Sequence, residues 1–167
     1  QKFILTNVYR EFMLDFQRNH RSGVFLQGEM DIMGPYMGKI AWIDLTKGEV
    51  SIIDTEPLAQ RFLGGRGINS WLLLQQIRLG TKPFDPENVI VFGAGALVGT
   101  SAPATCETSI GSINVTTGGI NFSHAGGYFA PAMKRAGFDH IAISGRSDRP
   151  VYLFLHDGLV EIRDADS

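Results

Sequence analysis

Several short stretches of the sequence show the hydrophobic pattern of β-strands. In residues 39–45 apolar and charged side chains alternate, and residues 50–53 return after a turn at Gly48, which predicts a hairpin. The continuous apolar run at residues 89–92 predicts a strand that is buried on both faces. Further strands are expected at residues 109–115, 140–144, 151–155 and 159–162, the last two joined by a type I′ turn at Asp157 and Gly158.

Three helices are predicted between these strands. Thr55 is a suitable N-cap for a short helix that ends near Leu63, and residues 68–78 form a second helix with Gly80 as its C-cap. A third helix is expected to open at residues 125–127 and to run to about residue 135. Because hairpins alternate with crossover helices, the chain is predicted to be α+β, with mixed and antiparallel β-sheets.

The first part of the chain has a different character. Residues 1–36 are predicted to be an extension or a loosely docked arm, with a short amphipathic helix at residues 7–19. Residues 37–167 are expected to form one domain, and the 44% of apolar residues in the chain supply a core for it, which argues against disorder.

Composition and charge exclude several classes of protein. The net charge of −2 provides no basic field for nucleic acid, and the longest apolar stretch, residues 89–99, is about half as long as a membrane helix requires. No secretory signal is visible, so the cytoplasm is the expected compartment. The single cysteine, Cys106, excludes an internal disulfide or a cysteine-rich cluster within these residues, and it is expected to be a small buried hydrophobe.

Glycine is concentrated in the middle of the chain. Of the 20 glycines, 12 lie between Gly64 and Gly127, which suggests a surface built from backbone that cradles a ligand. Glycines 93, 95 and 99 follow a strand, but residues 100–105 do not form the amphipathic helix that a dinucleotide-binding fingerprint needs. A nucleotide-binding enzyme is therefore disfavoured.

Two other glycine-rich segments have both a functional and a purely structural interpretation. Residues 125–127 open a helix whose free N–H groups attract an anion, with His124 as an added donor, or they form a tight strand-to-helix turn. Residues 64–67 hold Arg66 over an anionic ligand, or they end one helix and turn sharply into the next. The local sequence leaves both alternatives open.

A series of short motifs in residues 37–167 resembles the N-terminal domain of the tungsten-containing aldehyde ferredoxin oxidoreductase family. The motifs occur in order and with similar separations, and none of them lies in residues 1–36. They are Ile43–Gly48, Phe62–Gly67, Gly99–Pro103, Gly126–Phe129, Lys134–Asp139, Gly145–Arg146, Pro150–Tyr152 and Glu161–Ala165.

The resemblance implies a base on which a bis-pterin cofactor carrying tungsten or molybdenum lies, with magnesium bridging the pterin phosphates and His124 at the magnesium site. It also implies that an aldehyde is oxidised to a carboxylate, and that electrons leave through a 4Fe-4S cluster to ferredoxin or an electron-transfer subunit. The implied cofactor-binding residues are Gly64, Gly65, Arg66, Gly67, Gly99, Thr100, Ser101, Thr108, Ser109, His124, Ala125, Gly126 and Gly127.

Two residues depart from the pattern of better-known family members. His124 stands where those members have an asparagine whose backbone serves the magnesium site. Glu107 stands where they have an arginine near the pterin. A carboxylate at that position would repel phosphate unless Glu107 turns away.

The family's cluster cysteines, acid–base residues and second phosphate loop would lie after residue 167. The domain is therefore expected to be incomplete at its C-terminal end, and the 167-residue chain is not expected to catalyse the reaction alone. The alternatives are a non-catalytic binding or assembly module of the same fold, and part of a tungsten-dependent aromatic thioester reductase. A homo-oligomer is compatible with each.

Overall fold

A six-stranded sheet forms the centre of the domain. Its strands are β1 (Lys39–Asp44), β2 (Glu49–Asp54), β3 (Val89–Ala94), β4 (Thr108–Ile113), β5 (Ile120–Ala125) and β6 (His140–Ser144). Their order in the sheet is β2-β1-β6-β3-β4-β5. The computed structural model describes residues 35–166, so the helix predicted at residues 7–19 lies outside the described residues.

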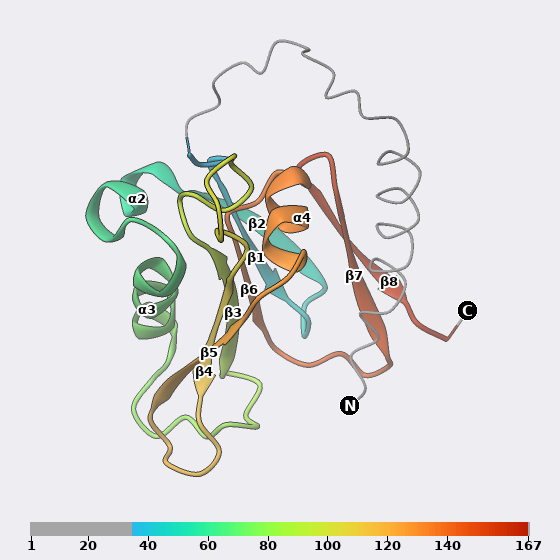
Figure 1. Ribbon diagram of the computed structural model, residues 1–167. Coiled ribbons are helices and arrows are strands. Elements are labelled where there is room, and N and C mark those ends of the chain that lie inside the picture. The colour runs from blue at the N-terminus through green and yellow to red at the C-terminus, as the bar shows by residue number, and fades with distance from the viewer. Residues whose placement is uncertain (1–34, 167) are drawn as a thin grey trace.

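The other elements cover the two faces of this sheet (Figure 1). Helices α2 (Glu56–Phe62) and α3 (Gly65–Gln76) lie on one face. Helix α4 (Phe129–Arg135) and a separate hairpin of β7 (Val151–His156) and β8 (Leu159–Asp164) lie on the other. Strands β1 and β6 are parallel and the other neighbouring pairs are antiparallel, which confirms the predicted α+β class with mixed sheets.

Each face of the sheet has its own hydrophobic cluster. The cluster under α2 and α3 consists of Ile40, Leu58, Ala59, Ile68, Leu72, Leu73, Val89, Val91 and Ala142. The cluster under α4 and the β7–β8 hairpin consists of Ala41, Ile43, Ala94, Val98, Ala130, Met133, Phe138, Ile141 and Ile143. Because both faces are covered, the central strand β6 is buried along its whole length.

The two hairpins expected from the sequence are confirmed. β1 pairs antiparallel with β2 from Lys39 opposite Asp54 to Asp44 opposite Glu49. β7 pairs antiparallel with β8, and the turn residues Asp157 and Gly158 have φ angles of 47° and 74°. Positive φ at both central residues is what a type I′ turn requires.

Several predicted boundaries are wrong. α4 begins at Phe129 rather than at residue 125, because residues 120–125 extend as strand β5 along β4. The expected strand at residues 109–115 ends at Ile113, and α3 runs from Gly65 to Gln76 instead of over residues 68–78. Gly80 therefore lies in the loop after α3 and does not cap it.

The predicted cap of α2 has the right position but a different mechanism. Thr55 occupies the N-cap, yet its side chain makes no capping hydrogen bond. The Asp54 carboxylate instead accepts from the backbone N–H of Glu56 at 3.0 Å. The Thr55 hydroxyl is buried and has no hydrogen-bond partner among the described residues.

Candidate functional site

Many of the predicted site residues converge at one end of the sheet, where β3 and β5 end and β4 begins. Ala94 of β3 pairs with Thr108 of β4, and Thr108 pairs with Ala125 of β5. One residue further along, Ser109 pairs with His124. Strand pairing therefore brings residues from three separate predicted segments side by side at this end.

The glycine-rich segment between α2 and α3 packs against the loop after β3. A Cβ atom on Gly64 would lie 3.3 Å from the Ala94 carbonyl oxygen, and both Gly64 and Gly65 have positive φ. A Cβ atom on Gly67 would lie 2.3 Å from the Phe62 carbonyl oxygen. These glycines thus serve the turn and the close approach of backbones, as the structural interpretation of residues 64–67 expects.

Arg66 is the member of this segment that projects a polar side chain. It lies in the first turn of α3 and is exposed, with its guanidinium carbon 4.7 Å from the centre of the Phe122 ring on β5. None of the carboxylates in residues 35–166 forms an ion pair with Arg66. The same helix turn contains no acidic residue and no side-chain cap. A free cation and uncapped N–H groups together favour an anion here.

Beside Arg66, a polar row crosses the sheet. In order across β6, β3, β4 and β5, the row consists of His140, Gly93, Ser109 and His124, each paired with the next. Paired residues point to the same face of a sheet. That face is the one under α3, since Ile40, which pairs with His140, packs in the cluster of α2 and α3.

The buried end of the polar row is tied to α3 through Asn69. The Asn69 amide donates to the Ser109 carbonyl oxygen at 2.9 Å, and the Asn69 Oδ1 lies 2.8 Å from His140 Nδ1. His140 Nδ1 is therefore the donor, and its Nε2 is a buried acceptor without a partner among the described residues. Burial, and secondarily the charge of Lys134, lowers the pKa of His140 to about 3, so the ring is neutral.

The exposed end of the row holds an unexpected pair. The Glu107 Oε1 lies 3.5 Å from His124 Nδ1, and both side chains are exposed. Glu107 therefore turns toward His124. The repulsion of phosphate expected of a carboxylate at this position stays a prediction.

The predicted residues 125–127 span the end of β5 and the turn before α4. Gly126 and Gly127 precede the helix in a turn, with φ of 119° at Gly127, and α4 itself has only seven residues. No heavy atom lies within 4 Å of the Cβ position of either glycine. Residues 126 and 127 form the turn between β5 and α4, and the turn leaves open space beside them, so the role of residues 125–127 in binding a ligand stays a prediction.

The remaining predicted residues lie in the loop after β3 or in β4. The Thr100 hydroxyl donates to the Leu97 carbonyl oxygen at 2.7 Å, so it is used within its own turn, and Ser101 is exposed. Gly99 lies beside the Lys134 side chain. Thr108 and Ser109 are buried in β4, and the Ser109 hydroxyl has no hydrogen-bond partner among the described residues.

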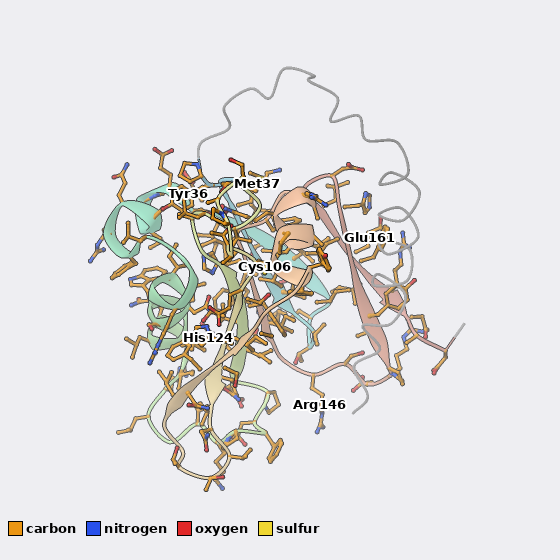
Figure 2. All side chains as sticks on the ribbon, viewed as in Figure 1. Tyr36, Met37, Cys106, His124, Arg146 and Glu161 are labelled. Atoms are coloured by element: carbon orange, nitrogen blue, oxygen red, sulfur yellow. The ribbon has the colours of Figure 1, made fainter. Side chains whose placement is uncertain are left out.

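Sequence reasoning was wrong about Cys106 and missed two kinds of residue. Cys106 is exposed in the loop before β4 rather than buried (Figure 2). The buried pair Lys134–Asp139 and the buried Asn69 were not identified as parts of the site. Lys134 and Arg135 are consecutive basic residues in the last turn of α4, so the local sequence gave no signal that Lys134 is the buried one.

Within the described part of the chain, no three side chains of His, Cys, Asp or Glu come together, so the metal role of His124 stays a prediction.

A hollow of about 380 Å³ lined by Trp42, Asp44, Gln76 and Ser144 lies at the opposite end of the sheet. No helix in residues 35–166 has the length and apolar character needed to span a bilayer.

The chain thus forms an α+β domain in which the loop at residues 64–67 meets the loop after β3. Arg66, without an ion-pair partner among the described residues, lies beside them. The family model of the aldehyde ferredoxin oxidoreductase N-terminal domain matches residues 40–167. The chain belongs to this family, which confirms the resemblance seen in the motifs.

The relatives are named as tungsten-containing oxidoreductases. A tungsten-containing aldehyde ferredoxin oxidoreductase of Pyrococcus abyssi is 42% identical over 131 residues, which is 78% of this chain and 22% of the relative. A protein of Pyrococcus furiosus named aliphatic sulfonate oxidoreductase, WOR-like subunit, is 35% identical over 137 residues, or 80% of this chain and 22% of the relative. The chain thus spans about a fifth of the length of these relatives.

A solved structure has the same fold. It is the active site complex BamBC of benzoyl coenzyme A reductase with 1,5-dienoyl-CoA, and it matches with a TM-score of 0.76 and 38% sequence identity. The match covers 79% of this chain and 20% of that chain.

Proposed function

We propose that this chain forms the cofactor-cradling base of a tungstopterin oxidoreductase. The observation that carries the proposal is Arg66, an exposed cation without a carboxylate partner among the described residues. It lies at the end of the sheet where the glycine-rich segment at residues 64–67 meets the loop after β3. The names of the relatives support tungsten as the metal. Molybdenum remains the alternative metal for the same pterin.

The residues at this end of the sheet fit an anionic group such as a pterin phosphate. Arg66 and the first turn of α3 would supply positive charge, and the unpartnered Ser109 hydroxyl would supply a hydrogen bond. The open side of Gly126 and Gly127 leaves room for a flat group, and His124 would lie beside a magnesium ion between the phosphates. The Glu107 carboxylate, 3.5 Å from His124 Nδ1, is a discordant charge at this end of the sheet.

The cofactor would supply the redox chemistry, and the chain would bind and orient it. We propose that the complete protein oxidises an aldehyde to a carboxylate and passes electrons through a 4Fe-4S cluster to ferredoxin or an electron-transfer subunit. The cluster would be held by residues outside this chain, since Cys106 is its single cysteine.

A second candidate function is supported by the structural match. The benzoyl coenzyme A reductase complex shares 38% identity with this chain, close to the values for the aldehyde oxidoreductases. In that case the same base would serve reduction of an aromatic thioester. Assaying the full-length protein with aldehydes and with a dienoyl thioester, using an artificial electron acceptor, separates the two: turnover of only the thioester would replace the aldehyde proposal.

Replacing Arg66 by alanine in the full-length protein tests the cradle. We expect tungsten and pterin per chain to fall at least about fivefold while the thermal unfolding midpoint stays within a few degrees, because an exposed arginine contributes little to stability and the anion loses its cation. Metal is measured by mass spectrometry and pterin by fluorescence after oxidation.

The control is Arg61→Ala. Arg61 also lies over a phenylalanine ring, with its guanidinium carbon 5.1 Å from the centre of Phe62, but it belongs to α2. The control variant should retain its cofactor. Equal tungsten and pterin content in the wild type and in the Arg66 variant would refute the role of Arg66.

A further inference from the structure

The segment just before β1, residues 35–38, touches several parts of the domain, and we call it the strap. The Tyr36 hydroxyl donates to the Leu63 carbonyl oxygen at 2.6 Å. The backbone N–H groups of Met37 and Gly38 donate to the two carboxylate oxygens of Asp139 at 3.0 and 2.9 Å. Figure 2 places Tyr36 and Met37 at the end of the domain where the loop after β3 lies.

Lys134 of α4 joins the strap to that loop. Its side chain is 5% exposed, and its ammonium group donates to the carbonyl oxygens of Pro35, Gly95 and Ala96, the last two at 3.3 and 3.2 Å. The ammonium group also lies 3.7 Å from the Asp139 carboxylate. One buried cation therefore satisfies three carbonyl groups on two separate segments.

The contacts of Tyr36 and Lys134 reach two glycine-rich loops, the one between α2 and α3 and the one after β3. Leu63 immediately precedes Gly64, and Gly95 and Ala96 are the residues against which Gly64 packs. Tyr36 thus holds the loop between α2 and α3, while Lys134 holds the loop after β3. Tyr36 packs against the cluster under α2 and α3, whereas Lys134 reaches the loop after β3 from α4 on the other face of the sheet.

We propose that Lys134, acting together with Tyr36 of the strap, is a positioning residue that fixes the two glycine loops relative to each other and thereby the cradle for the cofactor. The fixing of the loops follows from contacts within this chain. The consequence for the cofactor rests on the function proposed above.

A buried ion pair contributes little net stability to a fold. Desolvation of Lys134 and Asp139 opposes folding, and apolar residues of similar volume often give equal stability. Burial lowers the pKa of Lys134, and Asp139 opposes this shift, which shows that the two effects compete. An apolar residue, however, could not donate hydrogen bonds to the carbonyl groups of the strap and of the loop after β3.

The experiment compares two variants of the full-length protein by amide hydrogen exchange. In Tyr36→Phe, which removes one hydroxyl, we expect faster exchange at the Leu63 and Gly64 amides, by about fivefold, with the loop after β3 unchanged. In Lys134→Met we expect the Val98 amide, which bonds to Gly95, to exchange at least about tenfold faster. A buried control, Val89→Ala at the far end of β3, should lower stability without this local pattern.

The second readout is tungsten and pterin per chain. Tyr36→Phe and Lys134→Met are both expected to retain less cofactor than Val89→Ala at matched stability. Uniformly accelerated exchange in all three variants, or unchanged loop amides in Tyr36→Phe, would overturn the positioning role. A wild-type protein that holds neither tungsten nor pterin would refute the proposed function instead, and the exchange data would still decide whether the strap fixes the loops.

Discussion

Replacing Gly93 by alanine is expected to lower the free energy of unfolding by about 3 kcal/mol. A Cβ atom on Gly93 would lie 2.3 Å from Asn69 Oδ1 and 2.4 Å from His140 Nδ1, inside the hydrogen bond that ties α3 to the sheet. Both side chains are fully buried, so neither can move aside without breaking that bond. Overpacking of a filled core and loss of a buried hydrogen bond act together here.

Gly126→Ala is the matched control for this substitution. Nothing lies within 4 Å of its Cβ position, so its stability should change by no more than about 0.5 kcal/mol. Urea unfolding followed by the fluorescence of Trp42 and Trp71 gives both values. If the Gly93 variant were as stable as the Gly126 variant, the polar row would not be packed as described.

Lowering the pH from 7.5 to 5 is expected to cost the wild-type chain about 2 kcal/mol of stability through His140 alone. The pKa of His140 is about 3 in the folded protein, chiefly because the ring is buried, against 6.5 for a free histidine. Below pH 6.5, His140 takes up a proton in the unfolded chain but stays neutral in the folded chain. The stability is therefore complete above pH 6.5 and declines as the pH falls toward the folded pKa.

His140→Gln isolates this contribution. Glutamine does not titrate and its amide can still donate to Asn69 Oδ1, so other groups that respond to pH are common to both proteins. Urea unfolding of each protein between pH 5 and 8 gives the difference in their slopes. The wild type should lose more stability on acidification, by about 2 kcal/mol at pH 5. Parallel curves would show that His140 takes up a proton equally readily in the folded and unfolded proteins.

The sequence predicted the proposed cradle mainly through its glycines. The density of glycines between Gly64 and Gly127 indicated a surface of close backbone contacts, and the structure shows two such loops meeting at Gly64 and Gly95. The sequence could not say which glycines face a ligand. Gly64 and Gly67 face neighbouring backbone, whereas Gly126 faces open space.

The polar row and the strap could not be predicted, because their members are far apart in the chain. His140 and Asn69 are separated by 71 residues, and Lys134 and Pro35 by 99. Nothing in the sequence around either residue of a pair identifies the other. Their contacts depend on the strand order of the sheet, in which β6 lies between β1 and β3.

The sequence by itself determined the local elements and the family of this protein. Alternation of side chains specifies strands such as β1 and β2, and Asp157–Gly158 specifies a turn, since both depend on neighbouring residues. Only the tertiary structure decided that residues 120–125 form a strand, because most of that strand is exposed and its pairing with β4 is what extends it. It likewise decided that Glu107 faces His124 and that Lys134 is buried, because side-chain partners across a sheet follow from pairing rather than from sequence distance.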